Sequence, residues 1–467
     1  MELLNRAAGR FPGKAALIED SVSVPYSGLV EQVSNLAAQL DALQLKSGCR
    51  VGVAFPNSVN YVALTFALWR VRAVVVPIPV ECTLDEVAEI ASTLQLSGIL
   101  SERPILLAGG VSRPWPAGGY FMPLSPSELP DHHGLDAAFI RFTSGTTNKR
   151  KGVVLTHQTI YERVQAANRG LGVGPEDTVN WCLPMAHHFL VTMVLYLSQG
   201  ATVVLTPSTL ASPFLATVNR WRGTVLYAAP FHYALLARDR SAARLDSVRL
   251  AVSTTCGLPE SVALDFHERY GRPLIPALGI IELGLVSLNL ADPVGRWNSV
   301  GRPLGDYRLR IMNPDADGCG EIAWSGPGFL DAYAAPWQSR EQVLRDGWFL
   351  TGDLGRMDAD GFLFLAGRKT AVINMAGRKV FPEEIEAVLN RHPAIRESRV
   401  FGRPHAHLGE VVEAELVLDS PTAALDDLGD YCRKQLAPFK VPSQWRVVPA
   451  LARTSATGKI RRPMAVA

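Results

Sequence analysis

The sequence predicts an α/β fold with a large N-terminal domain of doubly wound parallel sheets and a smaller α+β unit at the C-terminal end. Helical patterns alternate with short β-branched runs over most of the 467 residues. This alternation is typical of parallel sheets covered by helices. After about residue 305 the pattern changes to antiparallel strands linked by turns, and a separate unit begins after Arg368.

The large domain is expected to contain its elements in a regular order. They are a helix over Tyr61–Arg72, a buried strand over Ala73–Ile78, a strand over Val153–Leu155 with a helix from about Gln158, and strands over Val203–Leu205, Val225–Ala228 and Leu250–Ser253. The segment Ser101–Gly134 is rich in proline and glycine, so we expect an irregular connection there.

The later elements are shorter and end at turn residues. Antiparallel strands are expected over Arg308–Met312, Gly320–Trp324 and Gly361–Leu365. Pro382 at a first helical position, followed by two glutamates in the first turn, predicts a helix start. A strand over Val412–Leu418 and a helix over Leu425–Leu436 complete the small unit.

Composition excludes several classes of protein. Apolar residues make up 48% and charged residues 19%, with a net charge of +2, which excludes a polybasic nucleic-acid coat and an acidic disordered tail. The six cysteines form no CxxC pair, so a reducing compartment is expected. No stretch approaches the roughly 20 apolar residues of a membrane span, and the first residues lack a signal peptide pattern. We expect a cytoplasmic protein with no nucleic-acid partner and no membrane span.

The segment 142–154, FTSGTTNKRKGVV, has the chemistry of a phosphate-binding loop. Its hydroxyls surround a glycine, and its basic residues follow. A backbone nest of N–H groups with added hydroxyl donors and a nearby cation binds phosphate oxygens. The pattern is not a Walker A loop. A solvated surface loop is the alternative interpretation of the same composition.

Two later segments carry further candidates. Asp353 follows Gly352, and a buried carboxylate there would accept two sugar hydroxyls, while Arg368 at a domain junction would bind a phosphate. The alternative is a turn aspartate and a junction arginine in a salt bridge. Lys459 stands beside Gly458 near the end of the sequence, where a lysine is usually solvated.

Together, these three segments resemble the class I adenylate-forming superfamily of acyl- and aryl-CoA synthetases, carrier-protein adenylation domains and luciferases. The resemblance covers nearly the whole chain through further segments, which are Gly13–Leu17 with Tyr26, Ala73–Pro79, Gly301–Pro303, Gly320–Gly328, Gly402–Glu410 and Phe439–Pro442. It implies a large adenylate-forming domain over 1–368, which adds a small β-barrel to the sheets. It also implies a small, mobile C-terminal domain over 369–467 that carries the catalytic lysine.

The resemblance implies a reaction in which a carboxylate attacks the α-phosphate of ATP and a thiol then attacks the acyl-adenylate. Glu282 would help to hold Mg²⁺, and Lys459 would bridge the carboxylate and α-phosphate oxygens. Thr370 would be the hinge between half-reactions, and Gly377 would approach the thiol tunnel. The implied ATP-binding residues are Thr143, Ser144, Gly145, Thr146, Thr147, Lys151, Gly257, Leu278, Gly279, Asp353 and Arg368.

Some positions depart from the family pattern. Asn148 and Arg150 replace Gly and Pro in the loop, and Thr370 replaces the usual hinge Asp or Lys. Leu278 cannot stack on adenine as Tyr would, and Ile281 lacks a hydroxyl that often reaches phosphate. These changes predict weakened ATP binding or a rebuilt adenine pocket.

The resemblance also places the acid pocket around Pro184–Leu190. The Asp that pairs with an α-ammonium in amino-acid-activating relatives is absent here, so we expect a non-amino acid, either aryl or medium-chain acyl. One of the adjacent histidines would lie at the substrate carboxylate or gate the pocket, and His188 is assigned the catalytic role. The implied pocket residues are His187, His188, Phe189, Thr255, Cys256 and Ile280.

Several functions remain open at this point. The leading one is an acyl- or aryl-CoA ligase, and the close alternative loads the acid onto the phosphopantetheine of a carrier protein. A non-catalytic nucleotide- or acyl-binding scaffold is the alternative from another class. The departures in the loop and the adenine pocket favour it, whereas retention of Glu282, Asp353, Arg368 and Lys459 argues against it. A luciferase-like oxygenase shares the adenylation half of the reaction.

Overall fold

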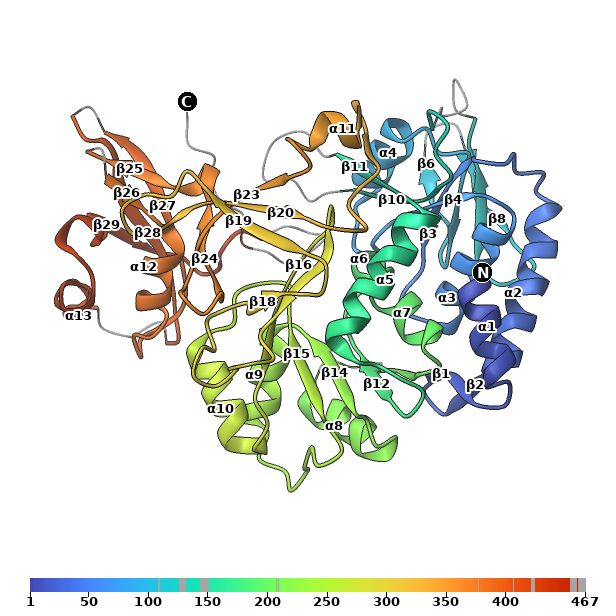
Figure 1. Ribbon diagram of the computed structural model, residues 1–467, viewed down its shortest axis with the longest axis horizontal. Coiled ribbons are helices and arrows are strands. Elements are labelled where there is room, and N and C mark those ends of the chain that lie inside the picture. The colour runs from blue at the N-terminus through green and yellow to red at the C-terminus, as the bar shows by residue number, and fades with distance from the viewer. Residues whose placement is uncertain are drawn as a thin grey trace. The chain divides into compact units, whose positions relative to one another are not determined.

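Figure 1 shows the computed structural model of the chain. The structure describes residues 1–107, 110–125, 132–142, 151–206, 208, 210–376, 378–405, 407–420, 425–453 and 460. These residues divide into two compact units. The large unit holds residues 1–142, 151–308 and 325–344 of the described chain, and the small unit holds 309–324 and the described residues from 345 onward. The predicted boundary after residue 368 stays a prediction.

The first sheet of the large unit has nine strands. In spatial order they are β18 (Arg302–Pro303), β17 (Gly284–Leu288), β16 (Ile275–Ile280), β15 (Leu250–Ser253), β14 (Val225–Ala228), β12 (Thr178–Trp181), β13 (Thr202–Leu205), β1 (Ala15–Glu19) and β2 (Val22–Pro25). The run from β16 to β1 is parallel, and both edges add antiparallel strands. The predicted strands over 203–205, 225–228 and 250–253 are confirmed.

The second sheet also has nine strands. Their order is β22 (Trp337–Ser339), β21 (Ala332–Ala334), β11 (Gly152–Thr156), β10 (Ala137–Phe142), β4 (Val74–Pro77), β3 (Arg50–Ala54), β5 (Gly98–Ser101), β9 (Tyr120–Pro123) and β8 (Arg113–Pro114). Strands β10, β4, β3 and β5 are parallel, and their apolar side chains form one buried core with those of β11.

The prediction of an irregular connection over Ser101–Gly134 is wrong in part. Strand β9 pairs antiparallel with β5, β8 pairs with β9, and two further short strands, β6 (Leu106–Leu107) and β7 (Gly110–Val111), pair with each other. An unpaired edge of β5 would leave backbone N–H and C=O groups without partners. The sheet edge therefore recruits segments whose own sequence does not favour strands.

Helices cover the two sheets. They are α1 (Glu2–Arg10), α2 (Tyr26–Asp41), α3 (Val59–Arg70), α4 (Leu84–Thr93), α5 (His157–Leu171), α6 (Met185–His188), α7 (Met193–Ser198), α8 (Ala211–Arg220), α9 (Pro230–Arg238), α10 (Glu260–Tyr270) and α11 (Arg340–Val343). Helix α5, which is labelled near the middle of the large unit in Figure 1, contacts β17 of the first sheet and β11 of the second. Its side chains can therefore reach loops of both sheets.

Local sequence fixes the ends of α5. The Thr156 hydroxyl accepts a hydrogen bond from the Thr159 N–H, which satisfies one of the free N–H groups of the first turn. Gly172 ends the helix in the left-handed conformation that glycine adopts without steric cost. The helix that we predict from about Gln158 is confirmed, and it begins at His157.

The small unit contains two sheets. The first has the order β19 (Arg308–Met312), β20 (Gly320–Ser325), β23 (Phe349–Met357) and β24 (Leu363–Arg368). The second has the order β26 (Arg378–Val380), β25 (Ile373–Met375), β28 (Gly409–Leu418) and β27 (Ile395–His405), with β29 (Gln444–Val447) also paired to β28. Helices α12 (Pro382–Leu389) and α13 (Leu428–Gln435) share a buried core with this second sheet, and the 3-10 turns are η1 (Lys369–Ala371) and η2 (Pro438–Lys440). The predicted helix start at Pro382 is confirmed.

A buried carboxylate joins three parallel strands of the first sheet at their N-terminal ends. Asp177 precedes β12 and accepts hydrogen bonds from Arg249 Nη2 at 2.7 Å, Thr224 Oγ1 at 2.7 Å and the Gly174 N–H at 2.9 Å. Burial by itself would raise the pKa of Asp177, but these hydrogen bonds outweigh it and hold the pKa below its usual value. The ionised carboxylate therefore stabilises the fold.

We expect Asp177→Asn to lower the free energy of unfolding at pH 7 by about 2 kcal/mol, since a charged acceptor of several bonds is lost. Because the folded pKa is depressed, this stabilisation is present above the unfolded pKa and is lost as pH falls, from about pH 5 downward. Urea unfolding from pH 7 to pH 3 should show a shallower acid decline for the variant. Asp246→Asn, an exposed carboxylate 3.8 Å from Arg244, is the control, and equal declines in all three proteins would contradict the prediction.

In the described part of the chain, no helix combines the length and the apolar character that a membrane crossing requires.

Candidate active site

The backbone of Glu282 is held by an arginine on α5. Arg163 is 3% exposed, and its guanidinium donates hydrogen bonds to the carbonyls of Ile281 at 2.9 Å, Glu282 at 2.6 Å and Gly328. The Leu330 N–H also donates to the Glu282 carbonyl, at 2.7 Å. Burial lowers the pKa of Arg163 to about 10, so the side chain remains a cation at neutral pH. The Glu282 carboxylate therefore projects from a fixed turn between β16 and β17.

Tyr333 connects two of the predicted site residues. Its hydroxyl donates to Glu282 Oε1 at 3.1 Å, and the Lys151 ammonium lies 4.5 Å from the centre of its ring. Strand pairing explains this position, because Tyr333 of β21 is the register partner of Val153 on β11, two residues after Lys151. Burial raises the pKa of the Tyr333 phenol, and the Glu282 charge raises it further, so the phenol stays a neutral donor.

We expect Tyr333→Phe to raise the Mg²⁺ concentration for half-maximal pyrophosphate release by roughly three- to tenfold, since one hydrogen bond of about 1 kcal/mol orients Glu282. The variant should keep its fold, because the ring still packs and still faces Lys151. Tyr161→Phe on the exposed side of α5 is the matched control. An unchanged Mg²⁺ dependence would show that this bond does not orient the carboxylate.

The donor set suits a magnesium ion that is brought by a polyphosphate. Mg²⁺ in such sites commonly takes one or two protein carboxylates and completes its shell with phosphate oxygens and water. Glu282 is a partly buried carboxylate with a single oriented oxygen, and Lys151 supplies a cation for phosphate nearby. Among the described residues, no group of three or more His, Cys, Asp or Glu side chains could hold a metal ion by itself.

The predicted acid-pocket segment forms α6. Asn57 anchors it, since its side chain accepts a hydrogen bond from the Met185 N–H at 2.7 Å and donates to the Leu183 carbonyl at 2.8 Å. His187 and His188 are both partly buried, and the His188 ring lies 6.2 Å from the Trp181 ring. Phe189 is 2% exposed and packs against other aromatic rings, so its role as a pocket wall stays a prediction.

The other predicted pocket residues lie after β15 and on the C-terminal half of the adjacent parallel strand β16. Thr255, Cys256 and Gly257 come directly after β15, while Leu278, Gly279 and Ile280 lie on β16. The carboxyl edge of an open α/β sheet is where ligands bind. Thr255 has φ of +78°, which is strained for a β-branched residue.

The small unit brings two predicted nucleotide ligands together. Asp353 on β23 is the register partner of Arg368 on β24, and Arg368 Nε lies 2.7 Å from Asp353 Oδ1. Arg368 also donates to the Thr351 carbonyl at 3.2 Å, and the Thr351 hydroxyl accepts from the Asp353 N–H at 3.0 Å. The Asp353 side chain is 17% exposed and that of Arg368 is 49% exposed. The salt bridge of the alternative interpretation is present, and it orients a carboxylate beside a partly exposed cation.

The predicted hinge residue Thr370 is exposed in η1, next to the ion pair between Lys369 and Glu321 at 2.8 Å. The phosphate-loop residues, the thiol-tunnel glycine and the catalytic lysine lie outside the described residues, and these are Thr143, Ser144, Gly145, Thr146, Thr147, Asn148, Arg150, Gly377 and Lys459. Their roles stay predictions.

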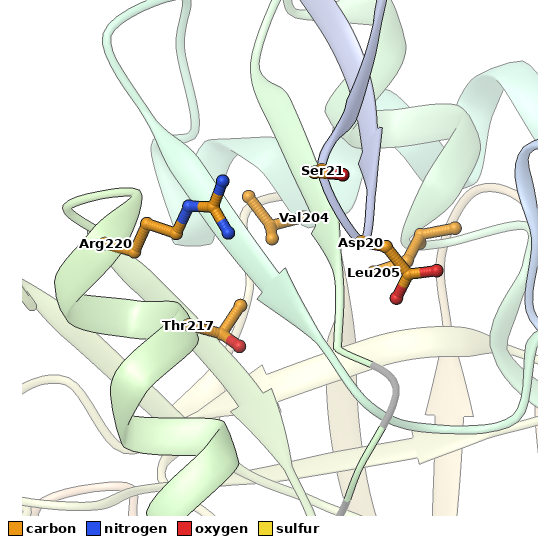
Figure 2. A pocket seen from close by; sticks show the side chains of 6 residues that line it. All are labelled: Asp20, Ser21, Val204, Leu205, Thr217 and Arg220. Carbon is orange, nitrogen blue, oxygen red and sulfur yellow. The ribbon is translucent and has the colours of Figure 1, made fainter.

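A surface hollow of about 330 Å³ lies elsewhere in the large unit. Figure 2 shows Thr217 and Arg220 extending from α8 toward β13, which carries Val204 and Leu205, with Asp20 and Ser21 of the β1–β2 turn beyond. None of its six lining residues is a predicted site residue. The residues that sequence reasoning missed are instead Arg163, Tyr333 and Asn57, whose roles depend on contacts between distant segments.

Comparisons with known proteins find two matching sequence profiles, several relatives and similar structures. The sequence profile described as "AMP-binding enzyme" matches residues 4–334, and that of the "AMP-binding enzyme C-terminal domain" matches residues 384–459. Oxalate–CoA ligase of Arabidopsis thaliana is 28% identical over 98% of this chain and 96% of its own length. Sulfoacetate–CoA ligase of Cupriavidus necator is 30% identical, over 97% and 95% respectively. The structure of o-succinylbenzoate CoA synthetase of Bacillus subtilis with its acyl-adenylate intermediate has a TM-score of 0.86 at 24% identity and covers 98% of this chain and 96% of that chain.

Proposed function

The chain belongs to the AMP-binding enzyme family, and from this premise we propose that it is an ATP-dependent acid–CoA ligase. One observation carries the proposal: Tyr333 contacts both the Lys151 cation and the Glu282 carboxylate. A cation beside a carboxylate that suits Mg²⁺ is the arrangement that a magnesium–polyphosphate needs. The oriented Asp353–Arg368 pair adds ligands of the kind that a nucleotide ribose and phosphate require.

The proposed reaction has two balanced steps. A carboxylate oxygen of the acid attacks the α-phosphorus of ATP, the new O–P bond forms, and the bond from the α-phosphorus to the bridging oxygen breaks to release pyrophosphate. The thiolate sulfur of CoA then attacks the acyl carbon, and the C–O bond to AMP breaks as the C–S bond forms. The thiol proton passes to solvent. Mg²⁺ would supply charge neutralisation for the departing pyrophosphate.

The residues take separate roles in the first step. Lys151 and the loop 143–152 would hold the β- and γ-phosphates, Glu282 would hold Mg²⁺, and Lys459 would lower the repulsion between the attacking carboxylate and the α-phosphate. Asp353 would bind the ribose hydroxyls, with Arg368 beside the phosphate. His188 would contact the substrate carboxylate. The family motifs support each of these assignments, and the Tyr333 contacts support those of Lys151 and Glu282.

The acid is proposed to lack an α-ammonium. The segment 184–190 contains no Asp or Glu, so no carboxylate of α6 is available to pair with such a group. CoA is the proposed acceptor, which the names of the CoA-ligase relatives support. The cytoplasm is the proposed compartment, and Cys49, Cys182, Cys319 and Cys432, which are buried thiols, support it.

Acid-dependent pyrophosphate release tests the proposal. Purified protein is assayed with ATP, Mg²⁺ and a panel of aryl, aliphatic and amino acids, each with CoA, with a phosphopantetheinylated carrier protein, or with hydroxylamine as a trap for the adenylate. We expect turnover with non-amino acids and acceleration by CoA. Acceleration by the carrier protein alone would show that the acyl acceptor is a carrier protein and not CoA. No pyrophosphate release with any acid, together with measurable ATP binding, would support a non-catalytic scaffold.

A further inference from the structure

A single charged residue interrupts the buried strand β10. The strand reads AAFIRF, and Arg141 is partly buried near its end. Its Nε is enclosed and has no hydrogen-bond partner within the described part of the chain. One Nη group donates to the His187 carbonyl, and the other lies 3.4 Å from His187 Nδ1. The guanidinium therefore lies against α6, the segment that is proposed to form the acid pocket.

The surroundings of the Arg141 charge differ from those of a salt-bridged arginine. Arg249 and Arg340 of the large unit contact carboxylates, those of Asp177 and Asp331, both at 2.7 Å, whereas Arg163 donates to backbone carbonyls. Among the residues that the structure describes, no Asp or Glu oxygen lies within the 4.0 Å of an ion pair with Arg141. Burial lowers the pKa of Arg141 to about 10, while the more distant negative charge of Glu282 acts to raise it. The Arg141 side chain therefore remains a cation at neutral pH. A buried cation that keeps its charge without a paired anion is costly.

A second buried polar group lies close to the acid-pocket segment. Tyr61 on α3 is fully buried, and its hydroxyl has no hydrogen-bond partner among the residues that the structure describes. Burial raises the pKa of Tyr61, while the nearby Arg141 charge opposes this shift. The Tyr61 ring lies 5.6 Å from that of Phe189, the residue that follows α6. A cation and a neutral donor thus adjoin the acid-pocket segment, and together they are complementary to an anion.

We propose that Arg141 is a specificity-determining residue that binds a second anionic group on the acid substrate, so that the enzyme acts on acids with two acidic groups. This inference rests on the proposed ligase function and names the substrate class of the same site. The second group is a carboxylate or a sulfonate, which share the chemistry that a guanidinium binds. An ATP phosphate is the competing anion, but the hydrogen-bonding contacts of Arg141 among the described residues run to His187 of the acid-pocket segment.

Matched pairs of acids test the proposal in the wild-type enzyme. Straight-chain acids of two to ten carbons and benzoate are compared with the same acids carrying a second carboxylate or a sulfonate, by pyrophosphate release. We expect kcat/KM at least tenfold higher for the doubly acidic member of the preferred pair. Higher activity with the single acid would overturn the inference while leaving the ligase function standing, and silence with every acid would overturn both.

Substitution of Arg141 locates the selectivity. Arg141→Gln should lower kcat/KM for the doubly acidic substrate by roughly 10- to 100-fold, mainly through the KM for the acid, as expected for loss of charged hydrogen bonds. Arg141→Lys keeps the positive charge, so kcat/KM for the doubly acidic substrate should fall less than in Arg141→Gln. Arg103→Gln, at a side chain that is 90% exposed, is the control for removal of one positive charge. A rise in the KM for ATP that is equal with all acids would assign Arg141 to phosphate and overturn the inference. If Arg141→Gln does not fold, the inference is tested by the matched acid pairs with the wild-type enzyme and by the Arg141→Lys variant.

Discussion

Substitution Lys459→Ala lowers acid-dependent pyrophosphate release by about 10²- to 10³-fold, the range expected when one preorganised charge is lost from a transition state. The attacking carboxylate and the α-phosphate are both anions, so their approach needs a cation between them. Lys459 lies outside the described residues, and the expectation rests on its position in the family motif beside Gly458. ATP binding, measured by isothermal titration calorimetry, should change little.

A matched control separates this effect from general loss of charge. Lys434→Ala removes an exposed lysine from α13 of the same unit and should leave the rate unchanged. An unchanged rate in Lys459→Ala would remove the lysine from the mechanism. Loss of ATP affinity in parallel with the rate would instead make Lys459 a ligand of the ground-state nucleotide.

Substitution Arg163→Met lowers the free energy of unfolding by at least about 2 kcal/mol. Of the three carbonyls it serves, two lose this donor at a cost of about 1–3 kcal/mol each, whereas that of Glu282 keeps the bond from the Leu330 N–H. Those carbonyls belong to Ile281, Glu282 and Gly328. Since two of them flank the carboxylate proposed to hold Mg²⁺, we also expect at least a tenfold lower kcat and a higher Mg²⁺ requirement in the protein that remains folded.

The same helix supplies the control. Arg169 on α5 pairs with Asp306 at 2.7 Å, but their side chains are 46% and 72% exposed. An exposed ion pair contributes little, so Arg169→Met should change stability by less than about 1 kcal/mol. Urea unfolding compares the two variants, and equal losses would show that Arg163 acts as an ordinary surface arginine.

Elements with a strong internal pattern were predictable. The apolar stretch before Arg70 forms α3, and the β-branched run after it forms β4. Pro382 begins α12 because proline fits a first helical position. The strands β6 to β9 were not predictable, because the local sequence of these segments does not favour strands. Strand β9 forms because it pairs with the edge of β5.

The candidate site divides in the same way. Asp353 and Arg368 could be singled out from sequence, and strand register then pairs them at 2.7 Å. Arg163 and Tyr333 belong to no motif in the sequence. The charge of Arg141 within the strand AAFIRF was the one available signal for that residue, since a buried strand seldom carries an unpaired cation.

The sequence by itself determined the family and the order of its elements, and it supplied the residues that we propose as phosphate, metal and nucleotide ligands. These follow from short-range patterns, in which neighbouring residues fix both backbone conformation and side-chain type. Only the tertiary structure decided that Tyr333 joins Lys151 to Glu282, that Arg163 holds the turn bearing Glu282, and that Arg141 lies against His187. Each of these contacts joins segments far apart in the chain, and only the packing of sheets around α5 and the pairing of their strands brings such segments within hydrogen-bond distance.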